Sequence, residues 1–139
     1  MSQNYTQKSL DAIRVAQSIA TDHGHLQLEP VHILYALLIQ DESLIAALLS
    51  RMGVEVASMQ KACEQALSRI SSVSGPGHKA GEIYVSQATD RLLNDSGKKA
   101  KSMNDEYISV EHLFLALLDS RDYTVQDIFK NYAITKDAF

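Results

Sequence analysis

The sequence predicts an all-α domain built from two similar halves. Apolar residues recur at helical spacing along the 139-residue chain, without the alternation of a β-rich protein. The segment around His32 also recurs around His112, and subtracting 32 from 112 gives an offset of 80 residues. At that offset a His, Ala, Leu, Leu frame aligns without a gap. Because one repeat cannot bury its apolar face alone, we expect the two copies to pack against each other.

We place the first copy at about residues 5–70 and the second at about 84–139, as parts of one domain. The alternative is that any two amphipathic helices look alike. The ungapped register and the match of apolar with apolar residues favour a true repeat. Further matches at this offset are Gln7 with Gln87, Ala20 with Ala100, Leu28 with Ile108, and Leu48 with Ile128.

The first copy is predicted to contain four helices. Thr6 is suited to cap the first helix, which ends in a polar, surface-exposed turn at residues 23–25, where two histidines flank a glycine. Pro30 suits the first turn of the second helix, where its missing N–H costs nothing. Ser43 opens a short third helix, and a fourth runs from about 56 to 70. The predicted core face of the first helix consists of Leu10, Ile13, Ala16, Gln17 and Ala20.

Residues 71–83 form the only segment rich in Gly, Ser and Pro, which predicts an exposed, flexible linker between the copies. The second copy then begins with Ser86 as a helix cap, and this helix continues to about Met103. A helix restarts after Ser109, and a third covers about 123–131. The chain ends where the counterpart of the fourth helix should begin. Either the second copy is naturally shorter or the chain is a fragment of a longer protein with a truncated last helix, and we expect the fragment.

Composition and charge exclude several classes of function. The 45% hydrophobic content supports a substantial core, and the net charge of −4 argues against nucleic acid as a partner. The single cysteine, Cys63, forms no internal disulfide and is expected to be a small buried hydrophobe. The first residues contain no basic region followed by an apolar run, so we expect no signal peptide, and no apolar run approaches the roughly 20 residues that span a bilayer. We expect a cytoplasmic protein with no membrane partner.

His32 and His112 invite a catalytic or metal-binding interpretation. A metal site needs several converging ligands, and no cysteine or second histidine supplies them at the right spacing. We favour a structural role, in which the buried imidazoles form hydrogen bonds with the backbone at the starts of two equivalent helices. Pro30 and Ser109 are assigned the same structural role at these helix starts. No nucleophile–base grouping or phosphate-binding loop is present in the sequence. The chain is therefore expected to be a binding module without catalytic residues, metal or cofactor.

One difference between the copies predicts a functional surface. Leu93 is assigned to the core face of its helix, and the adjacent Leu92 is assigned to the edge of that face. With Tyr84 and Val85, Leu92 would form an apolar patch where the halves meet. The alternative is that Leu92 only packs against the linker or the other copy.

The chain resembles the N-terminal domain of Clp ATPases in two runs, MNDEYISVEHL at residues 103–113 and EPVHIL at residues 29–34. The resemblance covers essentially the whole chain. Within that family the chain is most similar to the ClpB disaggregating chaperones, through VSG at 73–75 and YVS at 84–86. The branch that serves the ClpP peptidase usually repeats a Gly-His-x-x-(Ile/Val)-Gly-Thr-Glu-His run in both halves. This chain lacks that run.

The resemblance implies two four-helix repeats and a mobile linker to two AAA+ ATPase modules that form a hexamer. ATP and Mg would bind only in those absent modules, so this chain alone is expected to be a monomer without ATPase activity. The implied ligands are unfolded or aggregated polypeptides, and the implied partner of the full-length protein in the stress response is a DnaK-type chaperone system.

The family's functional polar positions match Thr6, Asp105 and Glu111. The resemblance therefore implies that these residues bind substrate, beside a shallow apolar groove to which we add Leu92. A purely structural role is the alternative, because Thr6 can cap a helix and Glu111 can favour a helix dipole. Asn104 stands where the family usually has glycine, which predicts altered turn geometry before Asp105.

Two other functions stay open at this point. The chain could be the adaptor-docking domain of a ClpA- or ClpC-type unfoldase that feeds a ClpP peptidase. It could also be a free-standing accessory protein of a Clp complex. The sequence that follows residue 139 in the parent gene would distinguish these alternatives.

Overall fold

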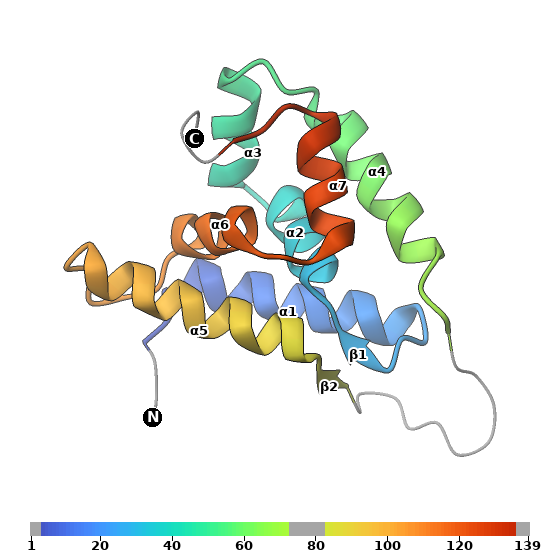
Figure 1. The fold of residues 1–139 in the computed structure, drawn as a ribbon, viewed down its shortest axis with the longest axis horizontal. Coiled ribbons are helices and arrows are strands. Elements are labelled where there is room, and N and C mark those ends of the chain that lie inside the picture. Colours follow the sequence, from blue (N-terminus) through green and yellow to red (C-terminus); the bar gives the residue numbers. More distant parts are fainter. Residues whose placement is uncertain (1–3, 73–82, 136–139) are drawn as a thin grey trace.

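The computed structural model describes residues 4–72 and 83–135, and within them seven helices and two short strands confirm the all-α class (Figure 1). The first copy contains α1 (Gln7–Asp22), β1 (Gln27–Leu28), α2 (Pro30–Ile39), α3 (Leu44–Arg51) and α4 (Val56–Ser68). The second contains β2 (Tyr84–Val85), α5 (Gln87–Ser102), α6 (Val110–Asp119) and α7 (Tyr123–Asn131). Most of the predicted linker, and the predicted last helix, lie outside the described residues.

The 80-residue offset of the sequence is preserved in the helices. α1 and α5 begin at residues 7 and 87, and α2 and α6 begin at 30 and 110. The caps are equivalent as well, since Thr6 accepts a hydrogen bond from the Ser9 N–H at 3.2 Å and Ser86 accepts one from the Thr89 N–H at 3.1 Å. The sequence repeat is therefore a structural repeat, and residues 80 apart can be compared directly.

α2 is the central element of the domain and contacts each of the other six helices. It is apolar on almost every side, and most of its residues, from Pro30 to Leu38, are buried. Figure 1 shows α2 and α6 between a layer formed by α1 and α5 and a layer formed by α3, α4 and α7. The two copies thus share one hydrophobic core.

The core face predicted for α1 is wrong at three of its five positions. Leu10 and Ile13 are only half-buried, and Gln17 is exposed. The buried residues of α1 are Ser9, Ala12, Ala16 and Ala20. Small side chains let α1 lie close against α2, so the larger aliphatic residues stay at the margins of the contact.

The two copies exchange short extended segments, which the sequence analysis did not predict. β1 of the first copy pairs in parallel with β2 of the second, and Leu28 lies opposite Val85. The equivalent parallel bridge joins Tyr5 of the first copy to Ile108 of the second. Segments of one or two paired residues are too short to show strand periodicity, so no sequence pattern marks them.

Equivalent side chains secure both crossings. The Ser9 hydroxyl donates to the Ile108 carbonyl at 2.8 Å, and the Thr89 hydroxyl donates to the Leu28 carbonyl at 2.6 Å. Both hydroxyls are buried, and each bonds to the N-cap side chain of its own helix. The start of each copy's first helix is therefore fixed to the segment that precedes the other copy's second helix.

The turn before Asp105 keeps the geometry of its counterpart. Asn104 has a φ of 59°, and Gly24, its counterpart 80 residues earlier, has a φ of 71°. Asparagine tolerates this left-handed conformation better than most residues with a Cβ. The expectation that Asn104 alters the turn is therefore wrong.

Among the described residues, no single helix is long and apolar enough to cross a membrane. α2 and α3 reach the required length and composition only as a pair bent by 82°, and α2 is buried in the core.

We predict that Thr89→Val will lower the free energy of unfolding by about 1–2 kcal/mol, because it removes the buried hydrogen bond to Leu28 while it keeps a β-branched side chain in the helix. Urea denaturation at neutral pH measures the change. Thr21→Val on α1 is the matched control, and we expect it to change stability by less than about 0.5 kcal/mol. An equal loss in both variants would show that the crossing bond contributes nothing specific.

Candidate functional site

The structure divides the predicted substrate-binding residues among four places. Thr6 and Glu111 line one groove, Leu92 lines a separate cavity, Tyr84 and Val85 lie on β2, and Asp105 is bonded to His112. The predicted substrate-binding residues therefore do not form a single site.

The groove that contains Thr6 and Glu111 lies where the start of α1 meets the start of α6 and the loop between α2 and α3. It has a volume of about 370 Å³. We call it the Thr6–Glu111 groove, and its lining residues are Thr6, Gln7, Lys8, Gln40, Glu42, Leu44, Ser109, Val110 and Glu111. Leu44 and Val110 supply apolar surface, while the Glu111 side chain is exposed. The groove thus combines an apolar floor with carboxylates at its rim.

Thr6 has a structural role in this groove. Its hydroxyl accepts the Ser9 N–H and donates to the Ser9 hydroxyl at 2.9 Å. Glu111 lies in the first turn of α6, where a negative charge is favourable. Of the two, the exposed Glu111 carboxylate is better placed to contact a ligand.

His32 and His112 occupy equivalent positions at the helix entrances, as the sequence predicts. Nδ1 of His32 accepts the backbone N–H of Glu29 at 2.8 Å, and Nδ1 of His112 accepts that of Ser109 at 2.9 Å. Because Nδ1 is the acceptor, Nε2 carries the proton in each neutral ring. Each Nε2–H is therefore available to a second partner.

That second partner differs between the copies. Nε2 of His32 donates to Nδ1 of His25 at 2.8 Å, whereas Nε2 of His112 donates to the Asp105 carboxylate at 2.9 Å. His25 is 1% exposed, so the expected surface position of this residue is wrong, while His23 is exposed as expected. His25 is buried because its ring bonds to His32 and packs against it at a centroid distance of 5.1 Å.

Burial shifts the titration of the histidine pair. Burial, with a smaller contribution from the neighbouring His25, lowers the pKa of His32 from 6.5 to about 4. Burial also lowers the pKa of His25, with a smaller contribution from His23 and an opposing backbone hydrogen bond to Leu67. Both rings are therefore neutral at physiological pH and form part of the framework.

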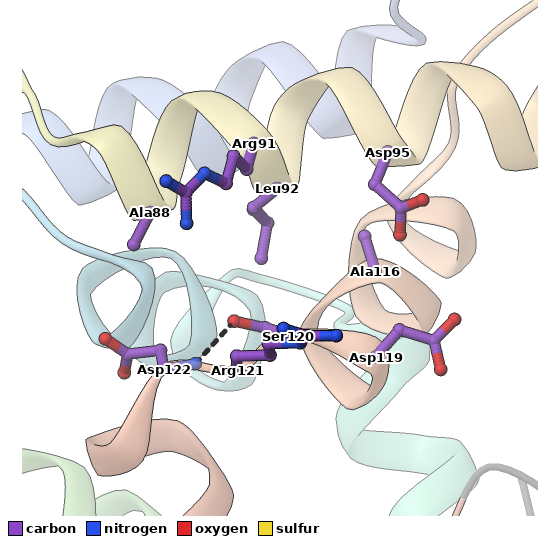
Figure 2. Close-up of a pocket in the computed structure, with 9 residues that line it drawn as sticks. All are labelled: Ala88, Arg91, Leu92, Asp95, Ala116, Asp119, Ser120, Arg121 and Asp122. Atoms are coloured by element: carbon purple, nitrogen blue, oxygen red, sulfur yellow. Dashed lines mark hydrogen bonds between the residues drawn. The ribbon is translucent and has the colours of Figure 1, made fainter.

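Leu92 lines a cavity between α5 and the loop that joins α6 to α7 (Figure 2). The cavity has a volume of about 360 Å³. We call it the Leu92 cavity, and it is lined by Ala88, Arg91, Leu92, Asp95, Ala116, Asp119, Ser120, Arg121 and Asp122. The assignment of Leu93 to the core face is wrong, because Leu92 is 2% exposed and Leu93 is only half-buried. Leu92 follows the register of Ala12, which is also fully buried.

Tyr84 and Val85 form an exposed apolar patch without Leu92. Their exposed fractions are 66% and 47%, and Leu26, whose carbonyl accepts the Tyr84 N–H at 3.0 Å, is 44% exposed. Exposed apolar residues gathered at one crossing are typical of a surface that contacts another chain.

The described residues contain no group of three or more His, Cys, Asp or Glu that could hold a metal ion. Cys63 is fully buried, and burial raises the pKa of its thiol to about 12. Its interpretation as a small buried hydrophobe is therefore confirmed.

The sequence analysis missed the charged residues around Leu92. Arg91 and Arg121 are far apart in the chain but line the same cavity. A comparison of the copies would have flagged the site, because Ala88 stands where the first copy has Lys8.

Comparison with known proteins identifies relatives over nearly the whole chain. Residues 4–132 match the Clp repeat (R) N-terminal domain family. The chaperone protein ClpB of Bacillus anthracis is 35% identical over 132 residues, which cover 95% of this chain and 15% of that protein. This chain therefore spans a small part of the length of such relatives.

Solved structures share the fold. The Hsp104 N-terminal domain from Candida albicans matches with a TM-score of 0.84 at 25% identity, and the match covers 98% of this chain and 86% of that one. A ClpV N-domain in complex with a VipB peptide matches with a TM-score of 0.71 at 20% identity, and that match covers 96% and 81% of the two chains.

We predict that the domain loses stability as the pH falls from about 6.5 to about 4. The unfolded chain takes up a proton at His32 near pH 6.5, whereas the folded chain resists protonation until about pH 4. The contribution of His32 to the free energy of unfolding is full above pH 6.5. It declines below that pH by at most about 3 kcal/mol. Urea denaturation at a series of pH values measures this slope.

His32→Gln tests the source of that slope. Glutamine can still accept the Glu29 N–H in a capping box but does not titrate, so the slope should become shallower. His23→Gln, at an exposed position, is the control and should retain most of the wild-type slope, because His23 is a minor cause of the lowered pKa of His32. An unchanged slope in His32→Gln would assign the acid sensitivity to other groups.

Proposed function

This chain belongs to the Clp repeat (R) N-terminal domain family, and we propose that it is the polypeptide-engaging domain of a ClpB-like chaperone. The match to ClpB along 95% of the chain carries this proposal. The Thr6–Glu111 groove supports it, because its apolar floor and acidic rim suit exposed segments of unfolded chains. The chain itself is proposed to be non-catalytic.

The wider setting is part of the same proposal. Because this chain spans 15% of the ClpB relative, ATP hydrolysis, bound Mg and assembly into a hexamer would belong to modules outside it. We propose that these modules use ATP to disaggregate the polypeptide that the domain engages, together with a DnaK-type chaperone system in the cytoplasm. Six copies of a weak site on one ring would raise avidity without a tight individual site.

A second candidate function is docking of a specific folded adaptor protein. One comparison bears on it, since a ClpV N-domain of the same fold was solved in complex with a VipB peptide, a segment of one particular protein. Adaptor docking predicts binding to one folded protein, whereas the proposed chaperone role predicts weak binding to many unfolded ones.

We predict that unfolded polypeptide will shift NMR resonances of this chain near Thr6 and Glu111, which line the Thr6–Glu111 groove. The ligand is reduced, carbamidomethylated lactalbumin, and the control is native lactalbumin with its disulfides intact. Binding of the unfolded form alone supports the chaperone role. Absence of shifts at these residues at millimolar ligand contradicts the site assignment.

We predict that Glu111→Gln will weaken binding of unfolded lactalbumin about twofold to fivefold, because it removes an exposed carboxylate at the rim of the groove. The melting temperature should change by less than about 2 °C, since an exposed first-turn charge contributes little to stability. Asp90→Asn removes an acidic side chain from the first turn of α5 and is the matched control. Equal changes in binding for the two variants would indicate a general effect of net charge.

A further inference from the structure

The Leu92 cavity occurs where the two copies differ at one contact. In the first copy, the Lys8 side chain donates to the Asp41 carbonyl at 2.5 Å, and the Gln40 side chain donates to the Lys8 carbonyl at 3.2 Å. These bonds tie the start of α1 to the loop between α2 and α3. The residues 80 positions later are Ala88, Ser120 and Arg121. Alanine cannot form the bridge, so space remains between α5 and the facing loop.

The carboxylates that line this cavity already have partners. Lys99 forms an ion pair with Asp95 at 3.5 Å and with Asp119. The Asp122 carboxylate accepts the Val125 N–H at 3.0 Å as the cap of α7. These three acidic side chains are therefore each engaged by another group of this chain.

The two arginines of the cavity, unlike its acidic residues, have no side-chain partner among the described residues. Within residues 4–72 and 83–135, neither Arg91 nor Arg121 forms a hydrogen bond or an ion pair with another side chain. Arg91 extends from α5 and Arg121 belongs to the facing loop, while Leu92 points into the space between them (Figure 2). Two available guanidinium groups thus stand beside an apolar floor of Leu92, Ala88 and Ala116.

We propose that the Leu92 cavity is a second polypeptide-binding site, specific for an aliphatic side chain adjacent to an Asp or Glu. The aliphatic group would pack on the half-buried Ala88, beside the buried Leu92 and Ala116, and the carboxylate would accept hydrogen bonds from Arg91 and Arg121. The volume of about 360 Å³ lies within the usual range for ligand pockets. This inference rests on the proposed function only in taking polypeptide as the ligand.

The test is an NMR titration of the ¹⁵N-labelled chain with three capped peptides, Ac-Gly-Gly-Leu-Xaa-Gly-Gly-NH₂, in which Xaa is Glu, Gln or Lys. The caps remove terminal charges, so only the Xaa side chain differs. We expect the Glu peptide to shift amides at 91–95 and 119–122. It should bind about threefold to tenfold more tightly than the Gln peptide, and less tightly as NaCl is raised.

Three variants locate the interaction. Arg91→Gln and Arg121→Gln should each weaken binding of the Glu peptide about threefold or more. Ala88→Lys should abolish the chemical shift changes that this peptide causes, because a lysine there can form the hydrogen bond that Lys8 forms in the first copy. Lys98→Gln is the matched control, because it removes one positive charge from an exposed site on α5 outside the cavity. Thermal unfolding of each variant verifies that it folds.

The proposal is overturned if the three peptides bind alike, or if the Lys peptide binds best. It is also overturned if Lys98→Gln weakens the Glu peptide as much as Arg91→Gln, or if folded Ala88→Lys retains the shifts. A parallel titration with unfolded lactalbumin separates this proposal from the first. Shifts at the Thr6–Glu111 groove without Glu-peptide binding reject only the cavity, and the reverse result rejects only the groove.

Discussion

The domain depends on the exchange of short extended segments between its two copies. Each crossing fixes the N-cap of one copy's first helix to the backbone just before the other copy's second helix. The Leu28 and Ile108 carbonyls each accept both a backbone N–H and a buried hydroxyl from the opposite copy. Because these polar groups are buried together, removing one partner while the copies stay packed leaves the other partner unsatisfied. Between the two crossings the copies share one core, with the apolar α2 at its centre.

The same framework holds different chemistry at equivalent positions. The His32 ring contacts another neutral imidazole, whereas the His112 ring contacts the carboxylate of Asp105. Lys8 closes a gap that Ala88 leaves open. Ala88 and Asp105 lie at the surface, whereas His25, the counterpart of Asp105, is buried against His32. The repeat thus supplies rigid positions, and the departures from symmetry supply the candidate binding features.

Much of the fold was predictable because its signals are local. The helix caps Thr6, Ser43 and Ser86 and the recurring histidine frame specify where the helices begin. The site was less predictable, because its features depend on contacts between distant residues. Burial of His25 requires His32, and the choice of Leu92 over Leu93 as the core residue follows from close packing on small side chains. Periodicity alone cannot resolve a one-residue rotation of a helix face.

The reciprocal crossings have the geometry of an isologous dimer interface. Tyr5 meets Ile108 and Val85 meets Leu28, so each copy offers the other the same pair of surfaces. The chain is in this sense a twofold homodimer joined into one polypeptide. In a true homodimer every substitution appears twice, once in each subunit. Fusion removes that restriction, and it is what allows an alanine at one position to coexist with a lysine at its equivalent.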